Sequence, residues 1–165
     1  MSDSRRRAEL FILVAFVFVV HAAFGPDLRV GDARPDLTVT AMLVAAQFSG
    51  PNTGAALGFF AGLLEASYVS IFVGSFLFTR TLAGYAIGAL EERVYRENVL
   101  VTVAIVALGT LFIQASFYVV APQHHAVQYF TRALWQTAYN SALSIPFFYV
   151  FRRVVSKKRF AAVGA

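Results

Sequence analysis

Long apolar segments alternate with short polar or turn-forming segments along nearly the whole chain. Six of these segments consist mainly of aliphatic residues, Phe and Gly, and they cover about residues 8–25, 36–49, 52–70, 74–92, 98–121 and 131–151. A helix needs about 20 mostly apolar residues to cross a bilayer, and repeated runs of this kind are typical of multi-pass membrane proteins. The pattern predicts an all-α membrane protein, a bundle of six transmembrane helices that forms a single domain over residues 1–165.

The second apolar segment is the shortest of the six. It has about 14 residues, fewer than the roughly 20 of an ordinary span, so a re-entrant or steeply inserted helix also fits it. Pro35 and Asp36 stand where this helix should begin. Both suit a first turn, because proline has no N–H to leave unpaired there and an acid interacts favourably with the helix dipole. Gly50-Pro51 predicts a tight turn into the third segment.

The basic residues test the number of spans. The chain has 14 Lys and Arg residues and a formal net charge of +5. With six spans, ten of the basic residues fall on one side of the membrane, namely Arg5, Arg6, Arg7, Arg93, Arg96, Arg152, Arg153, Lys157, Lys158 and Arg159. Arg29, Arg34 and Arg132 fall on the other side, and Arg80 lies within a span. The positive-inside rule then places both termini in the cytoplasm, whereas an odd number of spans would split the basic ends.

The composition excludes several classes of protein. Hydrophobic residues make up 58% of the chain and charged residues 14%, against about 25% charged in soluble domains. There is no cysteine, and no phosphate-binding glycine loop or nucleic-acid-binding motif. The adjacent His124 and His125 have no third metal ligand nearby. We therefore expect no catalytic residue, cofactor, metal or nucleic-acid partner, and we expect the C-terminal basic cluster to lie at the anionic headgroups of the lipid bilayer.

Glycine recurs every four residues in two neighbouring segments. The glycines are Gly50, Gly54, Gly58 and Gly62 in and before the third segment, and Gly84 and Gly88 in the fourth. On a helix the first four fall within about 120° of one another, with Glu65 in the middle of that face. Small residues let membrane helices approach backbone to backbone. The glycines therefore predict either close packing within the bundle or a groove that receives the helix of a partner.

Glu65 and Arg80 are charged residues in the interior of the third and fourth segments. The turn between these segments centres near residues 72–73, so an antiparallel hairpin brings both side chains to a similar depth. An isolated charge at mid-membrane costs about 3 kcal/mol or more, and we therefore predict an intramembrane ion pair. The pair can simply lock two helices together, or it can relay a proton or hold a ligand. Alternatively, Arg80 reaches the outer surface without pairing.

Polar residues recur every four positions in the last two segments. This polar stripe consists of Thr110, Gln114 and Tyr118 in the fifth segment and Arg132, Gln136, Asn140 and Ser144 in the sixth. In lipid such groups must find partners, each hydrogen bond being worth about 0.6–2 kcal/mol. The stripe therefore predicts hydrogen bonds between two helices, or a polar cavity open to the outer side. Pro146 can kink the last helix.

Several short motifs occur in an order that resembles the rod shape-determining protein MreD family of bacteria. They are Pro35-Asp36-Leu37, Gly50-Pro51, Gly54 to Glu65, Thr81 to Gly88, and Val94 to Asn98. The resemblance covers about residues 10–155 and includes the size, the six spans and the cytoplasmic ends. The family usually has aspartate at the position of Glu65, and Arg80 matches no family motif. The predicted ion pair therefore depends on the physical argument alone.

The resemblance implies a non-enzymatic component of the elongation machinery, the elongasome, in the bacterial inner membrane. Members of the family associate with MreC, which has one transmembrane helix and a periplasmic coiled coil. Together they link MreB filaments to RodA and its class B transpeptidase, which make peptidoglycan, and so maintain rod cell shape. The fold implied is that of the S component of energy-coupling-factor transporters, also six helices. We expect a scaffold whose glycine face receives the MreC helix.

A substrate-binding S component of a transporter is the alternative function. It predicts a water-accessible cavity near the outer leaflet, lined by Gln114, Gln136 and Asn140. A polar cavity of about 300 Å³ or more would favour this alternative, as would a ligand retained through purification. A neighbouring gene for MreC would favour the scaffold. An enzyme would need several acids, bases or metal ligands at one depth, and only Glu65 and Arg80 are candidates.

Overall fold

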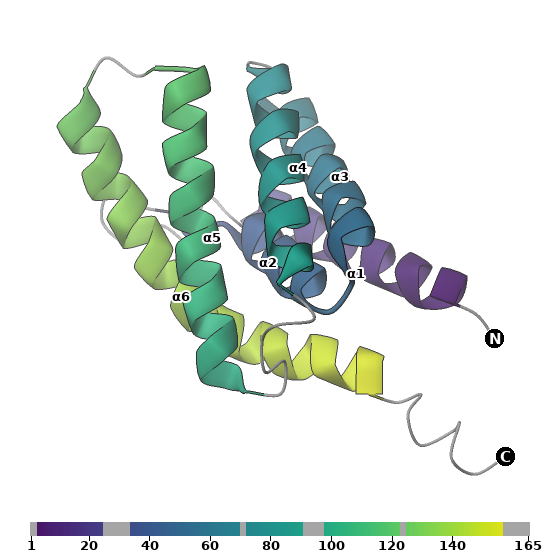
Figure 1. Cartoon of the computed structure of the whole chain (residues 1–165). Helices are drawn as coiled ribbons and strands as arrows, with labels where there is room; N and C mark the ends of the chain where they lie inside the picture. The colour runs from purple at the N-terminus through teal and green to yellow at the C-terminus, as the bar shows by residue number, and fades with distance from the viewer. Residues whose placement is uncertain (1–2, 25–33, 70–71, 91–97, 123–124, 157–165) are drawn as a thin grey trace, which may run out of the picture.

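The computed structural model describes residues 3–24, 34–69, 72–90, 98–122 and 125–156. Within these ranges the chain forms six α-helices and no strand: α1 (Asp3–Phe24), α2 (Leu37–Gln47), α3 (Pro51–Val69), α4 (Val73–Ala89), α5 (Val99–Val120) and α6 (Ala126–Ser156). The expected all-α class is confirmed for the described residues, and each apolar segment corresponds to one helix. In Figure 1 the start of α1 and the end of α6 lie on the same side of the bundle.

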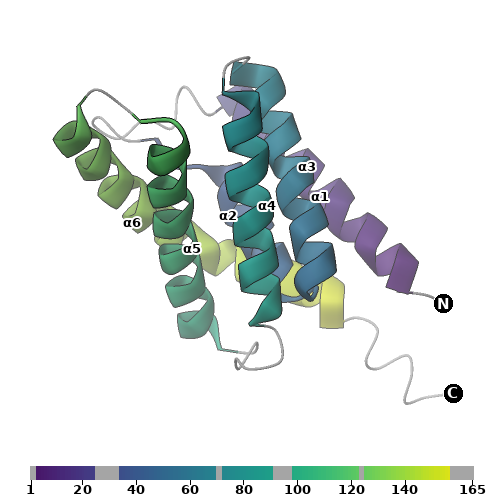
Figure 2. The ribbon, with the colours of Figure 1, turned by 45° about the horizontal axis from the view of Figure 1, so that its top comes forward.

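The short helix α2 lies at the centre of the bundle. It packs against each of the other five helices, and all of its residues are buried. Figures 1 and 2 show α2 between the α3–α4 pair and the α5–α6 pair. At about 1.5 Å per residue it rises roughly 16 Å, about half the thickness of the hydrocarbon core. The helix therefore cannot cross a bilayer alone, and its neighbours enclose it instead.

The helices α3 and α4 form the most closely packed pair. Their backbones touch, and a Cβ atom added to Gly54, Gly58, Gly62, Gly84 or Gly88 would overlap backbone atoms on the other side of the contact. The contacts pair Gly54 with Gly84, Gly58 with the carbonyl of Arg80, Gly62 with the carbonyl of Phe76, and Gly88 with Gly50. The two glycine faces cover each other in this structure, so they leave no open groove for a partner helix at these residues. The glycines serve packing within the bundle.

Gly50 belongs to the turn before α3, not to the helical glycine face. The helix α3 begins at Pro51, a position where the missing N–H of proline is harmless. Gly50 has a φ of 76°, which glycine adopts without the steric penalty of a Cβ atom. The turn also brings the carbonyl of Gly50 against Gly88.

The last helix is longer than the sixth apolar segment and is bent. α6 begins at Ala126 and ends at Ser156, whereas the apolar pattern indicates 131–151, and Pro146 lies inside it. An internal proline removes a backbone hydrogen bond and kinks a helix. Figure 1 shows α6 changing direction so that its C-terminal part runs along the lower side of the bundle. Phe148 and Phe151 beyond the proline are buried in the core.

Two helices are long and apolar enough, by length and composition, to cross a membrane. They cover Arg7–Phe24 in α1 and Val99–Val120 in α5. Large apolar side chains are also exposed on α1, α3, α4, α5 and α6, but none is exposed on α2. Soluble monomers rarely expose apolar surface on this scale, and contact with lipid would account for it. Crossing of the membrane by six segments stays a prediction.

Candidate binding cavity

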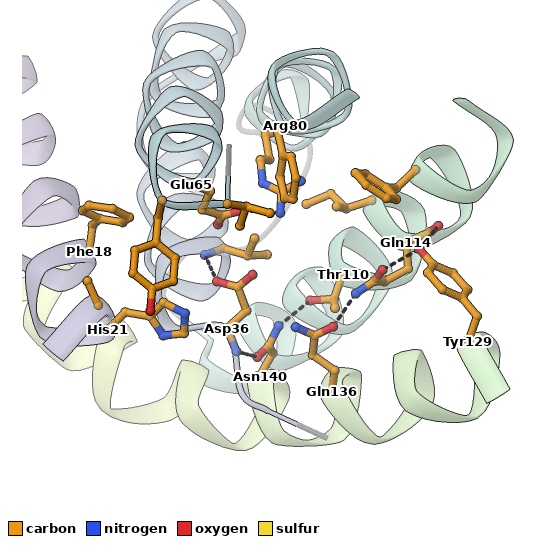
Figure 3. A pocket seen from close by; sticks show the side chains of 17 residues that line it. Phe18, His21, Asp36, Glu65, Arg80, Thr110, Gln114, Tyr129, Gln136 and Asn140 are labelled. Atoms are coloured by element: carbon orange, nitrogen blue, oxygen red, sulfur yellow. Dashed lines mark hydrogen bonds and ion pairs between the residues drawn. The ribbon is translucent and has the colours of Figure 1, made fainter. Parts of the chain in front are cut away.

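All six helices contribute to a cavity, lined by both polar and apolar side chains, at one end of the bundle. It has a volume of about 320 Å³ and is partly open. Its lining comes from the C-terminal halves of α1, α3 and α5 and from the N-terminal ends or halves of α2, α4 and α6. Figure 3 shows side chains from these helices converging on it. With both termini cytoplasmic, as the basic residues predict, this end would be the outer one.

Glu65 and Arg80 meet at the wall of the cavity. Nη2 of Arg80 contacts a carboxylate oxygen of Glu65, and both residues are buried. Arg80 also donates from Nη1 to Oγ1 of Thr79 at 3.3 Å, and its guanidinium carbon lies 4.4 Å from the centroid of the Phe76 ring. Each charge therefore has the partner that a buried ion requires.

The direction of the helices explains how these two side chains reach each other. The backbone of Arg80 lies beside Gly58, yet the guanidinium contacts Glu65, seven positions further along α3. Side chains tilt toward the N-terminus of their own helix. Arg80 therefore extends toward the cavity end, where α4 begins, and Glu65 tilts back from that end to meet it.

Asp36 brings a second carboxylate to the cavity. It is the N-cap of α2, and its Oδ1 accepts a hydrogen bond from the backbone N–H of Val39 at 2.9 Å. A capping acid is favoured by the partial positive charge of the helix N-terminus. The backbone N–H of Asp36 in turn donates to Oδ1 of Asn140 on α6 at 2.8 Å, so α6 helps to hold this acid in place.

Amide and hydroxyl groups of α5 and α6 form the opposite wall. Nε2 of Gln114 donates to Oε1 of Gln136, and Nδ2 of Asn140 donates to Oγ1 of Thr110 at 3.3 Å. The hydroxyl of Tyr129 donates to Oε1 of Gln114 at 2.7 Å. Four residues of the polar stripe thus both join the two helices and line the cavity. That the cavity opens to the outer side of the membrane stays a prediction.

The other three residues of the polar stripe lie elsewhere. The hydroxyl of Ser144 is buried and donates to the carbonyl of Ser141 within α6 at 2.6 Å. The ring of Tyr118 packs against the ring of Tyr129, and Arg132 is exposed. A spacing of four residues turns about 40° further around the helix at each step, so a long stripe cannot stay on one face.

Among the polar residues of the cavity that the predicted site does not include are Asp36, His21 and Tyr129. Asp36 was expected only to start a helix, and neither His21 nor Tyr129 belongs to a spaced pattern. The polar character of these residues was visible in the sequence. Their convergence was not, because they lie on α1, α6 and the start of α2, whose relative placement depends on long-range packing.

The chemistry of the cavity suits binding. Amides, a hydroxyl and charged groups provide hydrogen bonds, and aromatic rings, among them Phe18, Tyr68 and Phe117, provide apolar contact. A few polar groups in a largely apolar pocket are typical of small-molecule sites. Among the described residues no group of three or more His, Cys, Asp or Glu side chains is placed to hold a metal ion.

Comparison with known proteins adds one match. The chain matches the family described as rod shape-determining protein MreD over residues 6–158. This range contains both glycine faces and every residue of the cavity. No curated protein and no solved structure matches the chain.

Proposed function

Because this chain belongs to the MreD family of rod shape-determining proteins, we propose that it is a non-enzymatic scaffold of the bacterial elongation machinery. The family consists of membrane proteins and implies a role in rod shape determination. The finer proposal is that the chain binds MreC in the inner membrane. It would thereby help to couple MreB filaments to peptidoglycan synthesis by RodA and its class B transpeptidase. The match over residues 6–158 is the observation that carries this proposal.

The exposed ridge of α1 is the surface that we propose for the MreC helix. Ile12, Phe16 and Val19 lie on one helical face, and each is more than 60% exposed. α1 is also the less embedded of the two membrane-length helices, with 17% of its apolar stretch buried against 33% in α5. A helix with few neighbours leaves room for a partner, and in lipid the association depends on close side-chain packing.

Co-purification with MreC tests this proposal. Alanine at Ile12, Phe16 and Val19 together should reduce the amount of MreC recovered with the chain in mild detergent, because the substitutions remove the ridge. In the matched control, alanine replaces three residues together that are similarly exposed on α5, namely Leu100, Leu108 and Val119. Equal recovery of MreC with both variants would exclude the α1 ridge. Failure of the unchanged chain to recover MreC would contradict the scaffold proposal itself.

Capture of a small molecule is a second candidate function, and the cavity favours it. The volume of about 320 Å³ falls within the range of about 300–1,000 Å³ that is usual for ligand pockets. Gln114, Gln136 and Asn140 line it, as expected for an S component. Mass spectrometry of the purified, denatured protein tests this candidate. A small molecule in stoichiometric amount, together with a co-purifying ATPase-bearing module, would support a transporter over a scaffold.

A further inference from the structure

We propose that the cavity binds the primary ammonium group of a small organic amine. The proposal deepens the ligand-binding candidate above and rests on it, but it does not depend on contact with MreC. Glu65 of α3, His21 of α1 and Asp36 at the start of α2 surround one region of the cavity. Figure 3 shows these three side chains on one side of the cavity, away from Gln114.

Two of these three residues have a polar atom that nothing in the described part of the chain satisfies. Oε1 of Glu65 and Nδ1 of His21 are buried and make no hydrogen bond there. Glu65 is 7% exposed and lines the cavity. Buried polar atoms are nearly always paired, because an unpaired one loses its hydration without compensation. Nε of Arg80, which also lines the cavity, is a third such atom and is a donor. Oε1 of Glu65 can only accept, and Nδ1 of His21 accepts when the ring proton is on Nε2. These two acceptors point to a ligand that donates hydrogen bonds.

The charge of the cavity selects a cation. Asp36 and Glu65 contribute two carboxylates, and Arg80 contributes one guanidinium, so the lining has a formal charge of −1 when His21 is neutral. Arg80 is already engaged with Glu65 and with the ring of Phe76. A positive ligand balances the remaining charge at low dielectric, where charge interactions are strong. An anionic ligand would instead face two acids.

A primary ammonium fits this surrounding better than other cations. It has three N–H donors, which match Oε1 of Glu65, Nδ1 of His21 and the carboxylate of Asp36. Aromatic rings such as Phe18 and Tyr68 line the same cavity and can hold both a carbon skeleton and a cation. A free amine and the headgroup of an aminolipid present the same ammonium, and the experiment separates these sources.

Binding of three matched probes to the purified full-length chain tests the charge preference. The probes are 2-phenylethylammonium, the neutral 2-phenylethanol and the anionic 3-phenylpropionate, compared by isothermal titration calorimetry in phosphatidylcholine nanodiscs at neutral pH. We expect the ammonium to bind about tenfold or more tightly than the alcohol, because hydrogen bonds to charged groups are the stronger ones. Equal or tighter binding of the alcohol or the anion would overturn the amine class but leave a ligand cavity. Binding of none of the probes would overturn the cavity as an amine site.

Asp36→Asn removes the carboxylate charge but keeps the N-cap of α2, because asparagine is also a good N-cap. This variant should keep its unfolding temperature and bind 2-phenylethylammonium about tenfold or more weakly. The control Glu9→Gln removes an acid of α1 outside the cavity and should bind like the unchanged chain. If Asp36→Asn is folded and binds the ammonium unchanged, the proposed site is wrong. Glu65→Gln is the less suitable variant, because it also removes the partner of Arg80.

Nanodiscs of phosphatidylethanolamine identify the source of the amine. If an aminolipid headgroup occupies the cavity, the apparent Kd of 2-phenylethylammonium should be higher there than in phosphatidylcholine, and Asp36→Asn should abolish the difference. An equal Kd in both lipids would support a free amine. If folded Asp36→Asn still bound 2-phenylethylammonium with a higher Kd in phosphatidylethanolamine than in phosphatidylcholine, the proposed site would be wrong.

Discussion

Asn140 on α6 accepts a hydrogen bond from the backbone N–H of Asp36 at 2.8 Å, although 104 positions separate them in the sequence. The same side chain donates to Oγ1 of Thr110 on α5 at 3.3 Å. Asn140 is fully buried, so its amide joins the start of the central helix to the α5–α6 pair. This link sets the position of an acidic residue of the cavity relative to the amide wall.

Asn140→Ala should lower the free energy of unfolding by about 1–3 kcal/mol, because it leaves buried partners unpaired. The measurement is thermal unfolding in mild detergent. Ser141→Ala is the control, since this hydroxyl donates within α6, to the carbonyl of Thr137 at 2.7 Å. The control should stay within about 0.5 kcal/mol of the unchanged chain. A similar loss in both variants would show that the link to Asp36 contributes little.

Asp36→Ala should destabilise the protein by about 1 kcal/mol, because the N-cap of α2 is lost, whereas Asp36→Asn should leave the stability nearly unchanged. Comparison of the two unfolding temperatures measures the cap separately from the charge. An equal drop in both variants would mean that the carboxylate itself, and not the capping hydrogen bond to Val39, stabilises the fold.

Glu65→Gln and Arg80→Gln should each destabilise the bundle by about 3–5 kcal/mol, because each leaves a buried charge without its partner. The double variant should recover part of this loss, with a coupling energy of about 0.5–3 kcal/mol. A double-mutant cycle on unfolding in detergent gives the coupling. Additive effects would mean that the contact between these side chains does not stabilise the protein.

Gly58→Ala should separate α3 from α4, since its Cβ would overlap the carbonyl of Arg80. We expect loss of the folded state or a large fall in unfolding temperature, together with faster proteolysis. Gly74→Ala is the matched control, because in the described part of the chain nothing beyond its own helix backbone and sequence neighbours lies within 4 Å of the position its Cβ would take. Alanine favours a helix over glycine by about 0.5–1 kcal/mol, so the control should be neutral or slightly stabilising. Tolerance of both substitutions would contradict the close backbone contact.

The chain has no cysteine, so single cysteines can be introduced to test the predicted topology without maleimide labelling of native thiols in this protein. Arg34→Cys should react with a membrane-impermeant maleimide applied from outside, and Arg153→Cys should not, because the positive-inside rule places them on opposite sides. Both residues are exposed. Labelling of whole cells or spheroplasts, followed by mass shift on a gel, gives the result. If both variants were labelled, or if Arg153→Cys alone were labelled, the six-span topology would be wrong.

Features of the α3–α4 hairpin could be predicted because they are local. Glu65 and Arg80 follow one another on consecutive helices joined by a short turn, so their spacing alone indicates similar depth. The glycines mark a face for close approach for the same reason. The sequence does not tell whether α4 or the helix of a partner protein packs on that glycine face, because both would contact the same small residues.

The sequence by itself determined the all-α class and the places of the helices, because both depend on hydrophobicity and turn residues within about 20 consecutive positions. Only the tertiary structure decided that α2 lies enclosed at the centre and that α3 and α4 cover each other's glycines. It also brought His21, Asp36 and Glu65 to one cavity. These outcomes depend on which faces of distant helices pack together, and a helix face that contacts protein or lipid can carry the same apolar residues.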